Sequence, residues 1–279
     1  MQHIVSKTGV YYSTVSAQEP PVNPPSFRLS ALESRTVAEF WAFLAATPAL
    51  RLVGRGDRHP VLVLPGFMAD DRSTVPLRWT LRNQGYWVHG WKLGANIPTQ
   101  IKLDGLRARL NEIYTRHGNP VSVVGWSLGG VLARELARET PEQVRQVITL
   151  GSPFRLRGSD RSSLTEMVDR MNLDMVDMLT NQPPEQDRPP LPVPSTAIYS
   201  RSDGVIRWHV CIDGPGPLRE NIEVRSSHSG LGHNPAAVWA ISDRLRRPID
   251  NWRPFKAPAA ARCLFPKPMD WHSRIVETV

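Results

Sequence analysis

The chain of 279 residues is long enough for one large domain, with a multi-stranded sheet and helices covering both of its faces. Its hydrophobic content of 41% is that of an ordinary soluble protein. The net charge of +8 comes from scattered basic residues, without a polybasic tail or a nucleic-acid-binding motif. We interpret it as a solvated surface and expect no nucleic-acid partner.

The cysteines and the apolar stretches indicate in which cellular compartment the protein is expected. Cys211 and Cys263 have the spacing of neither a disulfide framework nor a metal site, so we expect a reducing, cytoplasmic compartment. Residues 1–16 have no apolar core of the signal-peptide type. Charged side chains interrupt the most apolar long stretch, so we expect no membrane-spanning helix. That stretch covers residues 31–50, and the interruptions are Glu33, Arg35 and Glu39.

In chain order, a Pro-rich arm precedes residues 31–46, where apolar side chains recur at helical spacing. This pattern predicts an amphipathic helix whose apolar face is packed against the rest of the protein. The face consists of Leu32, Val37, Phe40, Trp41 and Leu44. A short, fully apolar run at residues 61–64 then predicts a buried parallel strand.

Strands and helices alternate along most of the remaining chain. We predict strands at residues 86–91, 121–124, 144–150, 195–200 and 221–225, and helices at residues 77–83, 99–117, 128–138 and 235–245. This alternation predicts an α/β fold with a mostly parallel central sheet, right-handed crossovers and flanking helices.

Residues 154–194 interrupt the alternation and carry methionines at helical spacing, namely Met167, Met171, Met175 and Met178. Two interpretations stay open: a small helical cap or lid that closes over a site, or a helix packed on the core. We treat residues 1–279 as a single domain. Its parts are an amino-terminal arm and helix at 1–56, a core at about 57–250 that contains the cap or lid insertion at 154–194, and a carboxyl-terminal tail at 251–279.

The clearest chemical signal is the run Gly125-Trp126-Ser127-Leu128-Gly129. It lies between a predicted buried strand and a predicted helix, which is the context of a nucleophile elbow. In such a turn, glycines let the strand and the helix approach, and the serine hydroxyl is exposed at the positive end of the helix. We therefore predict that Ser127 is an activated nucleophile.

A serine nucleophile needs a base, and the base needs an orienting carboxylate. Asp203 directly follows a predicted strand and is the favoured acid, whereas the competing Asp213 lies farther from a strand end. Two histidines follow the last predicted strand. His228 lies in the loop immediately after it and is the favoured base; His233 lies nearer the final helix and is the alternative base.

The oxyanion of a tetrahedral intermediate needs two backbone N–H donors. One is the N–H of Leu128, the residue after the predicted nucleophile. The other should come from the loop after the first core strand. There Gly66 permits a close turn, and the N–H of Phe67 is the expected donor.

These motifs resemble the α/β-hydrolase superfamily, and within it the small bacterial lipases and esterases. Residues 64–67 look like the oxyanion-loop motif of these enzymes, residues 198–206 like the loop that carries their acid, and residues 227–231 like the loop that carries their histidine. The resemblance covers roughly residues 60–245. It implies the α/β-hydrolase fold, and it assigns the base to His228.

The sequence therefore predicts a serine hydrolase that needs neither cofactor nor metal and that cleaves small-molecule or lipid carboxylic esters. An acyltransferase or a thioesterase would use the same three residues and is the alternative within the fold. A non-catalytic lipid- or partner-binding protein is the alternative from another class. Membrane-surface contact through the amino-terminal helix stays open.

Overall fold

The computed structural model describes residues 23–156 and 183–270. The four methionines of the predicted cap or lid lie outside these ranges, together with most of the insertion at 154–194. The cap or lid therefore stays a prediction.

Short apolar runs form the strands of a central sheet. The strands are β1 (Pro60–Leu64), β2 (Trp87–Gly90), β3 (Val121–Trp126), β4 (Val144–Leu150), β5 (Ser195–Tyr199) and β6 (Arg219–Glu223). Their order across the sheet is β2-β1-β3-β4-β5-β6, and every pair of neighbours is parallel. The predicted parallel sheet is confirmed, and all carboxyl ends of its strands lie at the same edge.

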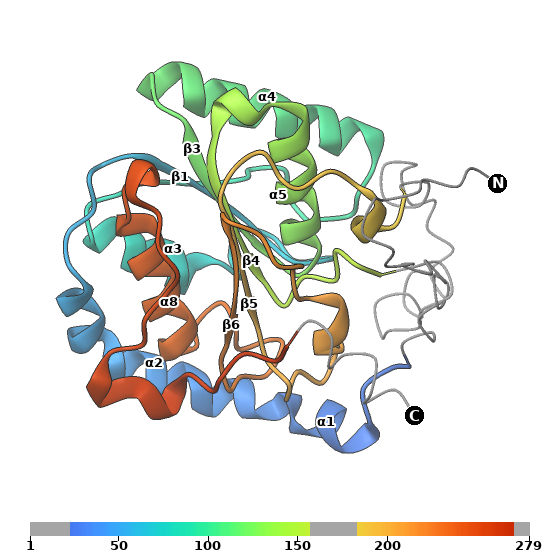
Figure 1. Ribbon diagram of the computed structural model, residues 1–279, viewed down its shortest axis with the longest axis vertical. Helices are drawn as coiled ribbons and strands as arrows, with labels where there is room; N and C mark the ends of the chain where they lie inside the picture. Colours follow the sequence, from blue (N-terminus) through green and yellow to red (C-terminus); the bar gives the residue numbers. More distant parts are fainter. Residues whose placement is uncertain (1–22, 157–182, 271–279) are drawn as a thin grey trace, which may run out of the picture.

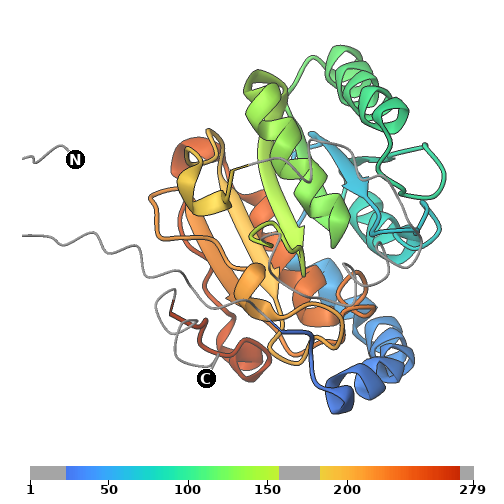
Figure 2. The same ribbon diagram turned by 90° about the vertical axis from the view of Figure 1, so that its right-hand side faces the viewer.

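Helices cover both faces of this sheet (Figure 1). They include α3 (Val75–Asn83), α4 (Gln100–His117), α5 (Leu128–Glu139) and α8 (Pro235–Arg246), with shorter 3-10 turns η2 (Arg51–Val53), η3 (Pro141–Gln143), η4 (Glu185–Asp187), η5 (Trp208–Val210), η6 (Ile249–Asn251) and η7 (Ala259–Leu264). In Figure 2, α5 lies in front of the strands.

The strand pattern explains the two layers. Successive side chains of a strand point to opposite faces of a sheet. In β1, Val61 and Val63 pack in a core cluster with α3 and α8, whereas Leu62 and Leu64 pack in a second cluster with α4 and α5. All four side chains are at most 1% exposed. Both faces of the strand are therefore buried, as its unbroken apolar run requires.

The amino-terminal segment differs from its prediction. In place of one helix over residues 31–46, the chain forms α1 (Phe27–Ala31), the 3-10 turn η1 (Leu32–Arg35) and α2 (Thr36–Leu50). The prediction that the apolar face is packed against the protein is wrong, because all five of its side chains are at least 36% exposed. These are Leu32, Val37, Phe40, Trp41 and Leu44. Instead, Phe43 and Leu50 are buried in the cluster that contains α8.

The described part of the tail, residues 251–270, lies against the domain without a strand. Phe265 joins the same core cluster as α8, and the Met269 N–H donates to the Tyr199 hydroxyl at 2.7 Å. Within residues 23–156 and 183–270, no helix is long and apolar enough to cross a membrane.

Candidate active site

Ser127 lies in the sharp turn between β3 and α5, with φ of +52° and ψ of −122°. A positive φ is uncommon for a residue with a Cβ atom and costs free energy, so the surrounding structure must impose it. The Ser127 N–H donates to the Leu150 carbonyl at the end of neighbouring β4, at 2.8 Å. The strained turn therefore stands at the carboxyl edge of the sheet, before the first turn of a helix.

Glycines allow the close approach that this turn requires. A Cβ atom on Gly125 would lie 2.3 Å from the carbonyl oxygen of Gly129, and a Cβ atom on Gly129 would lie 2.6 Å from the carbonyl oxygen of Leu64. Both distances are far below van der Waals contact. The glycines on either side of Ser127 are thus fixed by the packing of α5 on β3 and β1.

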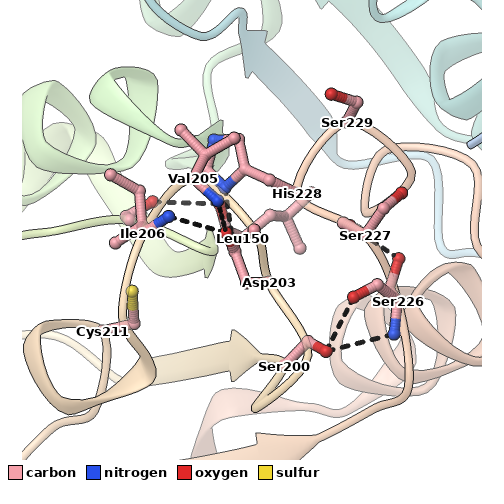
Figure 3. A network of polar contacts seen from close by, with 12 residues as sticks. Leu150, Ser200, Asp203, Val205, Ile206, Cys211, Ser226, Ser227, His228 and Ser229 are labelled. Atoms are coloured by element: carbon pink, nitrogen blue, oxygen red, sulfur yellow. Dashed lines mark hydrogen bonds and ion pairs between the residues drawn. The ribbon is translucent and has the colours of Figure 1, made fainter. Parts of the chain in front are cut away.

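Asp203 and His228 form a hydrogen-bonded pair in the loops after β5 and β6, which we call the acid loop (residues 200–206) and the histidine loop (residues 224–230). The Nδ1 atom of His228 lies 2.7 Å from Oδ2 of Asp203. The other carboxylate oxygen, Oδ1, accepts the N–H groups of Val205 at 2.8 Å and Ile206 at 2.7 Å. Figure 3 shows the two side chains turned towards each other.

This pairing determines the tautomer of the histidine. An ionised carboxylate only accepts hydrogen bonds, so Nδ1 of His228 carries the proton and Nε2 keeps its lone pair. Burial disfavours the imidazolium, but the Asp203 carboxylate, with a smaller contribution from Glu33, outweighs burial and raises the pKa of His228 above its ordinary 6.5. His228 is thereby prepared to accept a proton at Nε2.

Two contacts place this pair beside the turn that holds Ser127. The indole Nε1–H of Trp126, the residue before the serine, donates to the His228 carbonyl at 3.1 Å. Gly151 directly follows the carbonyl that Ser127 N–H contacts. A Cβ atom built on Gly151 would lie 3.1 Å from Oδ2 of Asp203 and 3.2 Å from Nδ1 of His228. The structure therefore brings the three predicted residues to one place at the edge of the sheet.

The loop after β1 also packs against the serine. A Cβ atom on Gly66 would lie 3.3 Å from Cβ of Ser127. The loop is held by Asn96, which accepts the Met68 N–H at 2.9 Å through its carbonyl and donates to the Pro65 carbonyl at 2.7 Å through its side chain. Phe67 lies in this loop. Leu128 is the first residue of α5, where an N–H has no acceptor within its own helix.

The two competing residues have other partners. Asp213 is buried, and its carboxylate lies 2.8 Å from Nη1 of Arg134 and 2.8 Å from the Ser195 hydroxyl. His233 directs its Nε2 to Thr36 in α2, at 3.2 Å from the hydroxyl and 3.1 Å from the carbonyl oxygen. The structure thus places Asp213 in an ion pair and His233 against a helix.

A second chain of serine, histidine and aspartate lies at the opposite end of β3. The Ser122 hydroxyl lies 2.8 Å from Nε2 of His59, and Nδ1 of His59 contacts Asp57. Ser122 is 0% exposed, and its hydroxyl also accepts a hydrogen bond from the Gln146 side chain at 3.2 Å. A substrate cannot reach it, so we interpret this second chain as structural.

Three charged residues were noted in the sequence only as interruptions of an apolar stretch, and their contacts with this site were missed. Glu33, Arg35 and Glu39 form hydrogen bonds with the acid and histidine loops. Their partners lie at least 167 residues away along the chain, so no local pattern connects them. The available signal was that they alone carry charge within the apolar stretch at 31–50. Across the described residues, no group of three or more histidine, cysteine, aspartate or glutamate side chains could hold a metal ion.

The parallel sheet, with a strained serine turn after β3 and an acid and a histidine after later strands, is the arrangement of the α/β-hydrolase fold, and the chain has this fold. The resemblance noted in the sequence is confirmed at the level of the fold. No protein-family model matches the chain, and no curated protein matches it in sequence.

Among solved structures, the chain is similar to lipase B of Aspergillus fumigatus, with a TM-score of 0.53 and 18% identity over 70% of this chain. It spans 54% of the length of that lipase. It is also similar to a structure from the study of LipS and LipT, two metagenome-derived lipolytic enzymes, with a TM-score of 0.51 and 18% identity, covering 68% of this chain and 93% of the other.

Proposed function

We propose that the chain is a serine hydrolase that cleaves carboxylic esters through an acyl-enzyme on Ser127. The observation that carries this proposal is the strained Ser127 backbone beside a buried Asp203–His228 hydrogen bond of 2.7 Å. A hydroxyl is a weak nucleophile unless a base removes its proton, and a base works best when a carboxylate orients it. The lipolytic activity in the names of the two similar structures is in keeping with this proposal.

The proposed reaction has two halves. Nε2 of His228 takes the proton of the Ser127 hydroxyl while Oγ attacks the ester carbonyl carbon. The N–H groups of Phe67 and Leu128 donate hydrogen bonds to the resulting oxyanion. The Leu128 N–H lies at the positive end of the α5 helix dipole, which stabilises the negative charge further. The C–O bond then breaks, and His228 returns the proton to the departing alcohol. In the second half, His228 takes a proton from water while the water oxygen attacks the acyl carbon. The bond between that carbon and Oγ of Ser127 then breaks, His228 returns the proton to Oγ, and the carboxylic acid leaves.

A burst experiment tests this proposal. The purified chain should release p-nitrophenol from short p-nitrophenyl esters in a burst of one equivalent per chain, and it should be labelled by a fluorophosphonate probe. A panel of esters graded by acyl length then separates a lipase from an esterase. A chain that shows neither burst nor label would rule out the acyl-enzyme.

The Asp203→Asn substitution should lower kcat by about 10⁴-fold. Because the N–H groups of Val205 and Ile206 donate to one side-chain oxygen, they would hold the amide with its NH₂ towards His228. Nδ1 of the histidine would then have to accept, and its proton would move to Nε2, where the reaction needs a lone pair. Steady-state kinetics with a p-nitrophenyl ester measures the loss.

Asp213→Asn is the matched control, since it also removes a buried carboxylate. It should destabilise the ion pair with Arg134 and lower the melting temperature, with kcat reduced much less than in Asp203→Asn. A larger loss of kcat in Asp213→Asn than in Asp203→Asn would mean that the acid is misassigned.

The Gly151→Ala substitution should reduce both stability and activity. At φ of +52° an alanine is strained, by about 1 kcal/mol or more, and its Cβ atom would lie 2.6 Å from Cδ1 of Leu231. The same Cβ atom would also crowd Oδ2 of Asp203 at 3.1 Å and Nδ1 of His228 at 3.2 Å, so we expect kcat to fall by roughly tenfold to 100-fold. Thermal unfolding and ester kinetics measure the two effects.

Gly118→Ala provides the control for backbone strain alone. Gly118 also has a positive φ, of +63°, but an added Cβ atom would meet nothing within 4 Å. This variant should lose stability with kcat unchanged. If Gly151→Ala behaved the same way, its position beside the pair would have no functional consequence.

A further inference from the structure

Glu33, in the turn η1, contacts both loops of the candidate site. Its Oε1 atom accepts the N–H of Gly204 at 2.8 Å and the N–H of His228 at 2.9 Å, and its Oε2 atom accepts the N–H of Ser229 at 3.0 Å. One half-buried carboxylate thus binds three backbone donors. The donors belong to segments that follow different strands, β5 and β6.

The geometry at Oε1 has a specific consequence. Gly204 is the residue after Asp203, so a single oxygen atom binds the backbone next to the acid and the backbone of the histidine itself. The separation of these two backbones determines whether the carboxylate and the imidazole can meet at 2.7 Å. An atom that bridges them therefore controls the distance within the pair.

The neighbouring side chains of the same segment reinforce this attachment. Arg35 donates to the Ser226 carbonyl at 2.7 Å and also contacts Ser202. Glu39 accepts the Ser227 N–H at 2.8 Å and its hydroxyl at 2.6 Å. The polar side of η1 and α2 thus faces the two loops, which explains why the apolar side faces outwards.

We propose that Glu33 is a positioning residue for His228, which holds the acid loop and the histidine loop at the separation that the reaction requires. The role rests on the proposed hydrolase function. Glu33 does not touch the reacting atoms; it acts through the backbones of Gly204, His228 and Ser229.

Charge adds to the geometric role. Burial alone would raise the pKa of Glu33, but the three backbone N–H groups outweigh burial and lower it, so the carboxylate is ionised at neutral pH. The charged groups that face the histidine loop are Asp203, Glu33, Glu39 and Arg35. Of these, Asp203 and Glu33 favour the imidazolium that forms during the reaction.

The Glu33→Gln substitution tests the proposal, because it keeps the shape of the side chain and removes its charge. The new amide has one acceptor oxygen and presents a donor to backbone donors, so at least one N–H loses its partner. We expect kcat to fall by roughly tenfold to 100-fold with little change in KM. The acid limb of the kcat/KM profile should move to lower pH, because a charge that favours the imidazolium is gone.

Glu220→Gln is the matched control. Glu220 is also a carboxylate that accepts a backbone N–H, that of Phe255, at 2.6 Å, but its side chain is 8% exposed and lies at the amino end of β6, away from the site. It also pairs with Arg244 at 2.8 Å, so the substitution should lower the melting temperature as well. This variant should keep both kcat and the pH profile. If Glu33→Gln likewise kept kcat within about twofold and the same acid limb, the proposal would be overturned.

An NMR titration of the His228 imidazole separates this proposal from the proposed function. In Glu33→Gln the His228 pKa should be lower than in the unsubstituted chain, whether or not the chain hydrolyses esters. An unchanged pKa would overturn the role of Glu33 even in an active enzyme.

If Glu33→Gln does not fold, Glu33→Asp is measured in the same two experiments. It keeps the charge on a shorter side chain, so it should lower kcat while its acid limb stays near that of the unsubstituted chain; unchanged kcat would count against the proposal.

Discussion

Replacing Ser127 with alanine should lower kcat for ester hydrolysis by roughly 10⁴-fold to 10⁶-fold and abolish labelling by a fluorophosphonate probe. The alanine removes the only atom that would bond to the acyl group, while the base and the oxyanion donors stay in place. The positive φ of Ser127 is imposed by the surrounding turn, and alanine carries the same Cβ atom as serine, so the substitution adds no backbone strain. Folding should therefore be retained, which circular dichroism and thermal unfolding check.

Ser122→Ala is the control for this result. Ser122 lies on the same strand and also contacts a histidine that is paired with an aspartate, but it is fully buried. Its loss leaves Nε2 of His59 unpaired and should cost about 1–3 kcal/mol of stability. Labelling and kcat should be kept. A Ser127→Ala chain that still hydrolysed the ester would show that another residue is the nucleophile.

Much of the fold could be predicted because its signals are local. The run of apolar residues in β1 requires burial on both faces, and the glycines around Ser127 require a close approach between a strand and a helix. The placement of Asp203 and His228 followed from one topological rule, since the carboxyl ends of parallel strands share an edge of the sheet. Each of these inferences needs only a few neighbouring residues.

The amino-terminal segment could not be predicted in the same way. Helical spacing in residues 31–46 identified an apolar face but not what lies opposite it. In the structure, the side that faces the protein carries Glu33 and Glu39, which accept loop N–H groups, together with the buried Phe43 and Leu50. Backbone donors have no signature in the sequence, so a carboxylate that binds them cannot be told from an ordinary surface charge. The exposure of Val37 and Trp41 is the consequence.

The His228→Ala substitution should lower kcat as severely as Ser127→Ala, by roughly 10⁴-fold to 10⁶-fold, because the nucleophile and its base act as a unit. The pH dependence of kcat/KM in the unsubstituted chain should also reflect the titration of His228. The imidazole must be neutral to accept the Ser127 proton, and the Asp203 carboxylate outweighs burial to raise the pKa of His228 above 6.5. kcat/KM should therefore rise with pH along an acid limb that lies above pH 6.5.

His233→Ala distinguishes the two histidines of the sequence prediction. The His233 ring lies 5.6 Å from the ring of Phe40, and its Nε2 contacts Thr36, so its loss should loosen the docking of α2. We expect a cost of about 1 kcal/mol, which lowers the melting temperature by roughly 2–4 °C. Because α2 carries Glu39 but not the base, kcat should change only a few-fold. If His233→Ala instead lost as much activity as is expected for His228→Ala, His233 would be the base. The hydrogen bond between His228 and Asp203 would then have a structural role.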